Sequence, residues 1–278
     1  MKIGIVGLGL IGGSIAKSLK ARTSHTVYAT DINEETMLLA RICGAYDAPL
    51  SDGNIEECDI VILALCPSIA LSWAKENAHK IAKGSVLADI CGVKRAVVGE
   101  FAQIAEQNRF NYIGTHPMAG KERGKFQNSS EDLFVGASMI LIPTDKTPIE
   151  ATEKLSILSS DIGFARVVIS NAEEHDRIIA YTSQLPHIIS SAYIKSPEAQ
   201  LNRGFSAGSF RDLSRVALLD ENMWTELFLA NDDHLLSQLE ILSDNLQKYI
   251  EAIKSRDADT LRTLLKEGRE LKSSAGGN

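Results

Sequence analysis

Cysteines are few in this chain, and they are scattered. Only four occur in 278 residues, at Cys43, Cys58, Cys66 and Cys91, and no two of them form a C-x-x-C pair. This pattern is typical of reduced thiols in a cytoplasmic protein and argues against a secreted domain held together by disulfides. A zinc site needs clustered ligands, which the sequence does not offer. We therefore expect a cytoplasmic protein without a metal site.

Long apolar runs are also missing. The longest mostly apolar stretch, Ile60 to Trp73, is interrupted at Cys66-Pro67-Ser68. It is shorter than the about 18 residues that suggest a membrane span. The apolar start, Met1 to Val6, is followed by glycines and not by a small-residue cleavage site. We therefore expect neither a membrane anchor nor a signal peptide.

The chain has no excess of positive charge. Its formal net charge is −7, with 29 basic and 36 acidic residues. A mildly acidic surface disfavours nucleic acid or an anionic membrane as the main partner. An anionic small substrate stays open, because a pocket can be basic on an acidic protein. With 44% hydrophobic residues, the composition is that of a globular protein with a full core.

Short β-branched runs alternate with helical patterns through the first part of the chain. In the first of these helical patterns, Ile11, Ile15 and Leu19 lie four residues apart and therefore share one face. Strand–helix alternation predicts a parallel sheet with helices on both faces, here in an α/β domain over residues 1–169. The predicted strands are Lys2–Val6, Thr26–Thr30, Asp59–Leu65, Ser85–Asp89, Tyr112–Thr115, Ser138–Pro143 and Arg166–Ile169.

From residue 170 to residue 278 the sequence predicts an all-helical domain. A long apolar pattern runs from Trp224 to Ile253 with spacings of three and four, which indicates a seam facing another helix. That seam fits either dimerisation or packing within one chain. A last helix is expected over Asp257 to Leu271 with Asp257 as its cap, and the tail 273–278 is expected to be disordered.

The segment Gly7-Leu8-Gly9-Leu10-Ile11-Gly12 matches G-x-G-x-x-G between a predicted strand and a predicted helix. In that position the motif predicts a dinucleotide site. Gly7 allows the tight turn, Gly9 lets a pyrophosphate approach the backbone, and Gly12 lets helix and strand pack closely. The free N–H groups at the helix start bind phosphate. Pro67 is a further expected cofactor contact.

Asp31 follows the second predicted strand, about 20 residues after the glycines. A carboxylate there hydrogen-bonds the ribose hydroxyls of NAD and repels a 2′-phosphate. The next residues, Ile32 to Glu35, include no Arg or Lys. The sequence therefore predicts NAD as the cofactor rather than NADP.

Among the six histidines, His116 has the context of a catalytic base. It lies in G-T-H-P-M-A-G, directly after a predicted strand, where open α/β sheets bind their ligands. A neutral imidazole suits a hydroxyl that loses its proton as hydride leaves. His175, by contrast, lies in the charged stretch Glu173 to Arg177, which predicts a solvated face.

A second polar group lies in the helical part, around His187, Arg215 and Trp224. The planar fork of Arg215 suits a carboxylate. Asp212 lies three residues earlier, on the same helical face, and is expected to orient Arg215. The alternative is an ordinary surface Arg–Asp pair.

At these residues the chain resembles the prephenate/arogenate dehydrogenase family over nearly its whole length. The glycine loop is shared by many dehydrogenases, but the combination of H-P-M-A-G with F-R-D-x-x-R is much more specific. The resemblance also includes D-I-C-G-V-K at 89–94, L-F at 133–134 leading into I-L-I-P-T at 140–144, and S-Q-L-P-H at 183–187.

The resemblance implies a Rossmann-like dinucleotide domain followed by a helical dimerisation domain, a homodimer, and an active site between the two domains. NAD would take hydride from C4 of a cyclohexadienyl acid while the ring loses carbon dioxide, giving 4-hydroxyphenylpyruvate from prephenate or tyrosine from arogenate. By family position, His116 accepts the hydroxyl proton and Arg215 binds a carboxylate. Other residues expected to bind the substrate or support its pocket are His187, Glu122, Asp212, Gln184, Trp224 and Lys94.

Two positions depart from the family pattern. Gly92 stands where many members carry Ser, and Gln184 stands where many carry His. A glutamine keeps hydrogen-bonding capacity but cannot become charged. Both changes bear on how the substrate hydroxyl is oriented and on which side chain the pocket prefers. A water or Ser183 is a hypothetical replacement for the missing hydroxyl.

Three alternatives remain at this point. Arogenate competes with prephenate as the substrate. A hydroxyacid dehydrogenase shares the fold but lacks the H-P-M-A-G and F-R-D-x-x-R combination. A non-catalytic NAD-binding sensor would bind NAD without turnover, since fold alone does not establish function.

Overall fold

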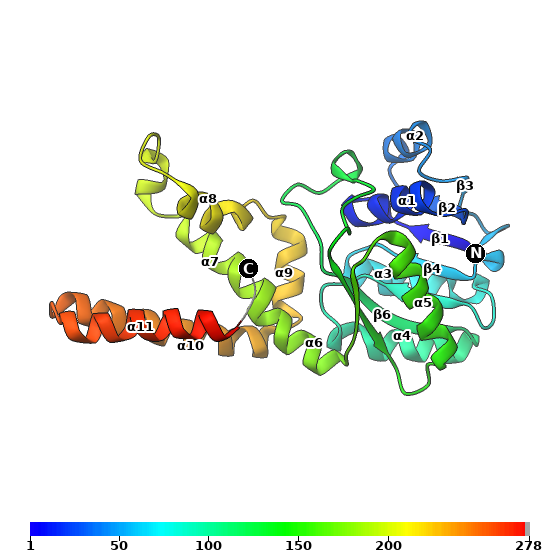
Figure 1. The fold of residues 1–278 in the computed structure, drawn as a ribbon. Coiled ribbons are helices and arrows are strands. Elements are labelled where there is room, and N and C mark those ends of the chain that lie inside the picture. The colour runs from blue at the N-terminus through cyan, green and yellow to red at the C-terminus, as the bar shows by residue number, and fades with distance from the viewer. Residues whose placement is uncertain (276–278) are drawn as a thin grey trace. The chain divides into compact units, whose positions relative to one another are not determined.

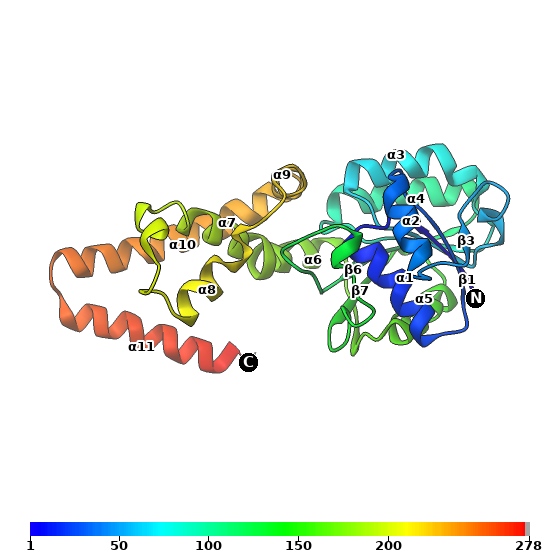
Figure 2. The ribbon, with the colours of Figure 1, turned by 90° about the horizontal axis from the view of Figure 1, so that it is seen from above.

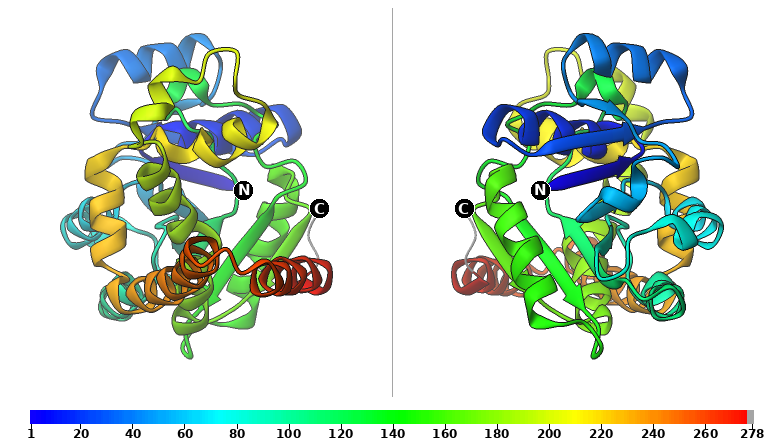
Figure 3. Two further views of the ribbon diagram at one scale, coloured as in Figure 1. Left: turned by 90° about the vertical axis from the view of Figure 1, so that its left-hand side faces the viewer. Right: turned by 90° about the vertical axis from the view of Figure 1, so that its right-hand side faces the viewer.

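The computed structural model describes residues 1–275, and within them eight strands form one sheet in the order β3-β2-β1-β4-β5-β6-β7-β8 (Figure 1). Figure 3 shows the blue strands that begin the chain and the green strands that end the sheet toward opposite edges. The strands are β1 Lys2–Val6, β2 Thr26–Thr30, β3 Ala48–Pro49, β4 Ile60–Leu63, β5 Val86–Asp89, β6 Asn111–Pro117, β7 Ser138–Pro143 and β8 Arg166–Ile169.

All seven predicted strands are confirmed with small shifts at their ends, but the sheet is not wholly parallel. Strand β7 runs antiparallel to β6, with His116 opposite Ile140, whereas the other neighbouring strands are parallel. The residues between β6 and β7 contain only a short 3-10 turn, η3 (Phe126–Asn128). Because a parallel return needs a crossover, usually a helix, the chain comes back in the opposite direction. The two-residue edge strand β3 is absent from the prediction.

Helices cover both faces of the sheet (Figure 2). One apolar core packs α1 (Leu10–Arg22), α2 (Glu34–Ile42) and α5 (Ile149–Ile162) on one face. A second core packs α3 (Pro67–Asn77) and α4 (Arg95–Asn108) on the other. The predicted face of α1 is confirmed, since Ile15 and Leu19 are buried. Packing on both faces explains why the strand sequences are continuously apolar.

After β8 the described chain is helical, as predicted. Helix α6 passes through a π-helical turn, η4 (Ala180–Gln184), directly into α7, and Asn171 caps α6 by accepting from Glu174 N–H at 2.9 Å. The elements up to Leu229 are α6 Ala172–Ile179, α7 Leu185–Tyr193, η5 Pro197–Leu201, α8 Gly208–Ser214, η6 Arg215–Ala217 and α9 Glu221–Leu229; the short 3-10 turns of the sheet region are η1 Ile55–Glu57 and η2 Ala78–Lys80.

The chain divides into two compact units, and the second begins at Asp232. It holds α10 (Asp232–Lys254) and α11 (Ala258–Ala275), joined by a short turn. The Tyr249 hydroxyl donates to Leu264 O at 3.2 Å. The predicted Asp257 cap is confirmed, because its carboxylate accepts from Thr260 N–H at 3.0 Å.

Two expectations for the C-terminal region change. The apolar pattern from Trp224 to Ile253 spans two helices and not one, since α9 ends at Leu229 and α10 starts at Asp232. Part of the expected disordered tail is helical, because α11 continues through Ser273 and Ser274 to Ala275. The last three residues of that tail, 276–278, lie outside the described residues. No helix among the described residues is both long and apolar enough to cross a bilayer.

Candidate active site

The glycine loop after β1 is shaped by close backbone contacts. Gly7 has φ +91°, and a Cβ there would lie 2.5 Å from Ala64 O. A Cβ at Gly12 would lie 2.0 Å from Gly7 O. At Gly9, by contrast, a Cβ would meet nothing within 4 Å. Gly7 and Gly12 are therefore required by the fold itself, whereas Gly9 keeps an open approach to the backbone.

The surroundings of this loop fit a dinucleotide. Gly9 is the N-cap of α1 and no side chain caps it, so the first-turn N–H groups, among them that of Ile11, are available to an anion. Asp31 lies at the end of β2, and its carboxylate accepts from Leu8 N–H at 2.7 Å and from Asn33 N–H at 2.9 Å. Pro67 is the buried first residue of α3, after β4. Uncapped helix N–H groups and a carboxylate thus lie along one edge of the sheet, the arrangement that a dinucleotide site requires.

His116 lies within β6 and not after it, because the strand extends to Pro117. The side chain is partly buried. Its Nδ1 is 2.8 Å from His175 Nε2. On its other side, a Cβ at Gly92 would lie 4.0 Å from His116 Nε2. The two ring nitrogens therefore have different surroundings.

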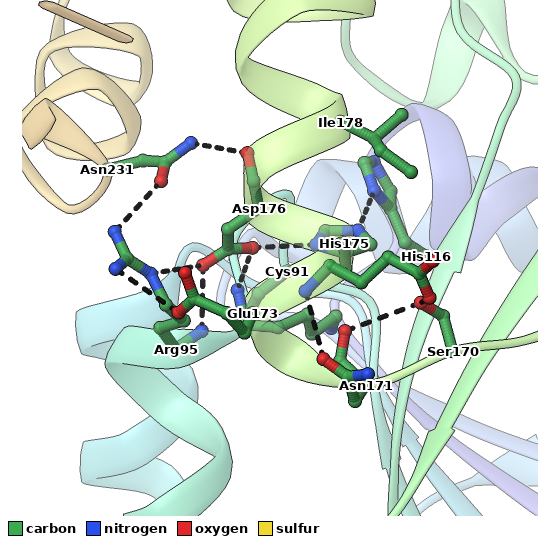
Figure 4. Close-up of polar contacts among 12 residues, drawn as sticks. Cys91, Arg95, His116, Ser170, Asn171, Glu173, His175, Asp176, Ile178 and Asn231 are labelled. Carbon is green, nitrogen blue, oxygen red and sulfur yellow. Dashed lines mark hydrogen bonds and ion pairs between the residues drawn. The ribbon is translucent and has the colours of Figure 1, made fainter. Parts of the chain in front are cut away.

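The prediction that His175 lies on a solvated face is wrong. Its residue exposure is 2%, and its Nδ1 is 2.6 Å from Asp176 Oδ1. The stretch Glu173 to Arg177 is charged, but helix α6 turns His175 and Asp176 toward the sheet domain (Figure 4). Burial lowers the pKa of His116 well below its usual range and also lowers the pKa of His175. Both imidazoles are therefore neutral near pH 7.

Asp176 connects this pair to the start of α4. Its Oδ1 accepts from Lys94 N–H and its Oδ2 from Arg95 N–H, each at 2.8 Å. Asn231 donates to Asp176 O at 2.9 Å and to Gln184 Oε1 at 2.7 Å. These bonds, some drawn in Figure 4, fix α6 against the end of the sheet that carries His116.

Two residues expected to contact substrate lie in the interior. Lys94 is fully buried, and its ammonium lies 2.5 Å from Asp89 Oδ1, beside the Tyr112 hydroxyl on Oδ2. Gln184 is 1% exposed. Its amide nitrogen donates to Leu227 O at 3.0 Å while its oxygen accepts from Asn231. In this structure both side chains serve packing and hydrogen bonding within the protein.

Arg215 lies in a basic groove of about 430 Å³. Its guanidinium pairs with Glu122. A backbone hydrogen bond and, after it, this bond to Arg215 hold the pKa of Glu122 below its usual range. Asp212 does not orient Arg215 as predicted and instead lies 3.6 Å from Arg211 Nε. The reason is that α8 ends at Ser214, so the expected helical spacing stops before Arg215. The groove is lined by Lys121, Glu122, Arg123, Asn128, Arg211, Ser214, Arg215 and Leu218.

His187 and Trp224 form a stacked pair with ring centroids 3.8 Å apart. His187 Nδ1 donates to Ser183 O at 2.8 Å, and burial lowers the pKa of the ring. Trp224 also lines a groove of about 280 Å³ with Ile188 and Phe228. The second polar group predicted around His187, Arg215 and Trp224 is therefore divided between a basic groove at Arg215 and an aromatic groove at Trp224.

The sequence analysis missed His175, Asp176 and Asn231. A helical signal for the first two was present. His175 lies four residues before Ile179 and Asp176 lies three residues before it, so both share a face with the buried Ile179. Asn231 had no such signal, because it lies at the break between α9 and α10.

A glycine loop and a partly buried histidine at the same edge of an α/β sheet define a dinucleotide-dependent oxidoreductase. Comparison with known proteins gives the particular family. Residues 15–169 match the nucleotide-binding domain of prephenate dehydrogenase, and residues 171–267 match the prephenate dehydrogenase dimerization domain. The chain belongs to the prephenate dehydrogenase family, and its cofactor is NAD.

Individual relatives agree over most of their length. The cyclohexadienyl dehydrogenase of Zymomonas mobilis is 32% identical over 97% of this chain and 94% of its own. The prephenate dehydrogenase of Lactococcus lactis is 30% identical over 98% of this chain and 76% of its own. The structure of A. aeolicus prephenate dehydrogenase with hydroxyphenyl propionate and NAD+ has a TM-score of 0.86 at 28% identity, covering 99% of this chain and 98% of that one.

Proposed function

We propose that this protein converts prephenate to 4-hydroxyphenylpyruvate by oxidative decarboxylation, in tyrosine biosynthesis. The observation that carries the proposal is the environment of His116. This histidine is partly buried at the end of β6, its pKa is lowered by burial, and Nδ1 is engaged by His175. Nε2 lies on the side of Gly92. A neutral base near a dinucleotide loop suits oxidation of a hydroxyl group.

Bound NAD supplies the acceptor for the hydride that leaves C4 of the substrate. In the proposed reaction His116 Nε2 takes the proton of the C4 hydroxyl as that oxygen becomes a carbonyl. The bond between the ring and its carboxylate then breaks, and its electron pair makes the ring aromatic. Carbon dioxide leaves, and His116 returns its proton to the phenolate oxygen. The histidine therefore ends the cycle in the form in which it began.

Arg215 is the proposed anchor for a substrate carboxylate, because a guanidinium in an open basic groove can bind carboxylate with two parallel hydrogen bonds. Glu122 would hold Arg215 until substrate arrives. His187 and Trp224 would line the pocket, while Asp212 would act from the rim. The proposed NAD contacts are Gly7, Leu8, Gly9, Leu10, Ile11, Gly12, Asp31 and Pro67.

The proposed domains are residues 1–169 for NAD and 170–278 for substrate and dimerisation. The matches to two family models that meet near residue 170 support this division, although the compact units meet at Asn231 and Asp232. A homodimer through the helical domain is supported by the match to a dimerization domain and by Leu246 and Ile253, which are both more than half exposed. The four free cysteines support a cytoplasmic location.

The test is NADH formation, followed by absorbance, with prephenate and arogenate offered separately to the purified protein. We expect turnover of prephenate, and a loss of about 10²- to 10⁴-fold in kcat in His116→Ala with NAD binding retained. The matched control is His79→Ala, which removes an exposed histidine. Turnover of arogenate alone would reassign the substrate. No turnover of either, with NAD still bound, would contradict the proposal and favour an NAD-binding sensor.

A further inference from the structure

We infer that Asp176 and His175 act as positioning residues that set the tautomer of His116, so that Nε2 is the proton-free nitrogen of the base. This inference rests on the proposed function for its catalytic consequence, but the tautomer itself is a property of the folded protein. It follows from three hydrogen-bonding steps.

The first step is the state of Asp176. Its two oxygens accept backbone N–H groups of Lys94 and Arg95, and Oδ1 also contacts His175 Nδ1. Lys94 is the N-cap of α4 and Arg95 its first residue, where the helix dipole favours negative charge. A carboxylate that receives these donors is ionised and can only accept. His175 Nδ1 must therefore carry a proton.

The second step concerns the other nitrogen of His175. Burial keeps this ring neutral, so a proton on Nδ1 leaves Nε2 without one. His175 Nε2 is then an acceptor, 2.8 Å from His116 Nδ1. The bond between the two rings forms only if His116 Nδ1 donates. In neutral His116 the proton is on Nδ1, and Nε2 is bare.

The third step is where the bare nitrogen lies. The Cβ that Gly92 lacks would be 4.0 Å from His116 Nε2. On this side Gly92 presents no side chain to the ring, whereas His175 of α6 occupies the Nδ1 side. We therefore place the substrate hydroxyl on the Nε2 side. The charged groups that face the two rings are Asp176 from α6, Lys94 from the start of α4, and Asp89 from β5.

The same chain of bonds has a role after proton transfer. When Nε2 takes the substrate proton, His116 becomes an imidazolium and Nδ1 still donates to His175. His175 in turn donates to Asp176, whose negative charge is thereby oriented toward the new positive charge. Neither His175 nor Asp176 needs to contact the substrate. Both act through His116.

The direct test is ¹⁵N NMR of the histidine rings in the full-length protein near pH 7.5. We expect His116 Nδ1 to carry a proton and Nε2 to show the chemical shift of an unprotonated nitrogen. Asp176→Asn presents an amide that can donate to His175 Nδ1, and it should invert or mix the tautomers. A wild-type His116 protonated on Nε2 would overturn the inference, whatever the activity.

The kinetic test uses His175→Leu and His175→Gln. Leucine removes the acceptor for His116 Nδ1, whereas glutamine retains an oxygen that can accept that proton. We expect kcat to fall about 100-fold in His175→Leu and to recover in part in His175→Gln, with the Kd for NAD unchanged. Wild-type kcat in a folded His175→Leu would contradict the inference. Absence of turnover in the wild type would instead contradict the proposed function and leave the NMR result standing.

Discussion

The glycine loop and the histidine pair lie at the same edge of the sheet, but backbone atoms form the first and side chains form the second. The loop depends on close backbone contacts that leave no space for side chains at some of its glycines. A Cβ at Gly12, for example, would lie 2.0 Å from Gly7 O. The pair consists of two polar side chains, the partly buried His116 and the buried His175, and its function depends on which ring nitrogen donates the hydrogen bond. Steric volume therefore limits which substitutions the glycine loop tolerates, whereas the positions of the ring protons determine what the histidine pair can do. Substitutions should fail in correspondingly different ways.

The largest expected effect is in the loop. Gly12→Ala should lower the free energy of unfolding by about 3 kcal/mol or abolish folding, because the added carbon meets backbone that cannot move aside. Gly9→Ala is the matched control, since its Cβ meets nothing within 4 Å. That variant should keep its melting temperature and weaken NAD binding. Equal melting temperatures for the two variants would show that the fold does not depend on Gly12 more than on Gly9.

The next largest effect is expected at Arg215, the proposed anchor for a substrate carboxylate, where the shape of the side chain matters as well as its charge. Arg215→Ala should raise KM for prephenate about 10- to 100-fold, the range for losing a hydrogen bond to a charged group. Arg215→Lys keeps the charge but loses the planar fork, so its KM should lie between those of the wild type and Arg215→Ala. Steady-state kinetics with saturating NAD measure both. A KM for Arg215→Ala equal to that of the wild type would remove Arg215 from the substrate site.

Asp31 is the exception within the loop region, because a side chain and not backbone is expected to act there. Asp31→Asn should raise KM for NAD about tenfold and reduce discrimination against NADP, since the repulsion of a 2′-phosphate is lost. Asp145→Asn is an exposed control. If Asp31→Asn leaves the NAD/NADP preference intact, the carboxylate only holds the loop through Leu8 N–H.

A smaller effect should appear with pH. The pKa values of His116 and His175 in the fold lie below their usual 6.5. The stability that depends on these neutral rings is therefore complete above about pH 6.5 and is lost as the pH falls below it toward the folded-state pKa values. The melting temperature should drop on acidification through this window, and less steeply in His175→Leu. An identical pH dependence in that variant would show that His175 does not contribute.

The smallest effect is expected at Gly92. A Cβ there would be in ordinary contact with Leu227 at 3.4 Å and would lie 4.0 Å from His116 Nε2, so one rotamer of a serine hydroxyl can reach that nitrogen. Gly92→Ser should raise kcat/KM about threefold, as one added hydrogen bond to the substrate hydroxyl would. Gly92→Ala separates the volume from the hydroxyl. A tenfold loss in both variants would mean that the space beside Gly92 is already filled by substrate.

The two regions also differed in how far the sequence predicted them. The spacing of Gly7, Gly9 and Gly12 between a strand and a helix predicted the loop geometry, because all the residues concerned lie within one β–α turn. Local apolar patterns likewise predicted seven strands. The direction of β7 was missed because it depends on the connection after β6 and not on the residues of the strand.

The polar site was harder because its contacts are long-range. His116 and His175 are 59 residues apart, and the neighbours of His175 in the sequence are charged, which concealed its burial. Asp212 was matched to Arg215 by helical spacing, but the helix ends between them and Glu122 takes its place. Only tertiary packing decides such pairings, so sequence reasoning found the chemical groups and not their partners.

If His116 and NAD carry out one coupled oxidation and decarboxylation, the products must form in equal amounts. The most direct measurement is the stoichiometry of NADH, carbon dioxide and 4-hydroxyphenylpyruvate formed from prephenate by the wild-type protein. We expect equal amounts of all three, and we expect His116→Ala to form them about 10²- to 10⁴-fold more slowly. NADH formed without carbon dioxide, or bound NAD with no NADH formed, would contradict this expectation.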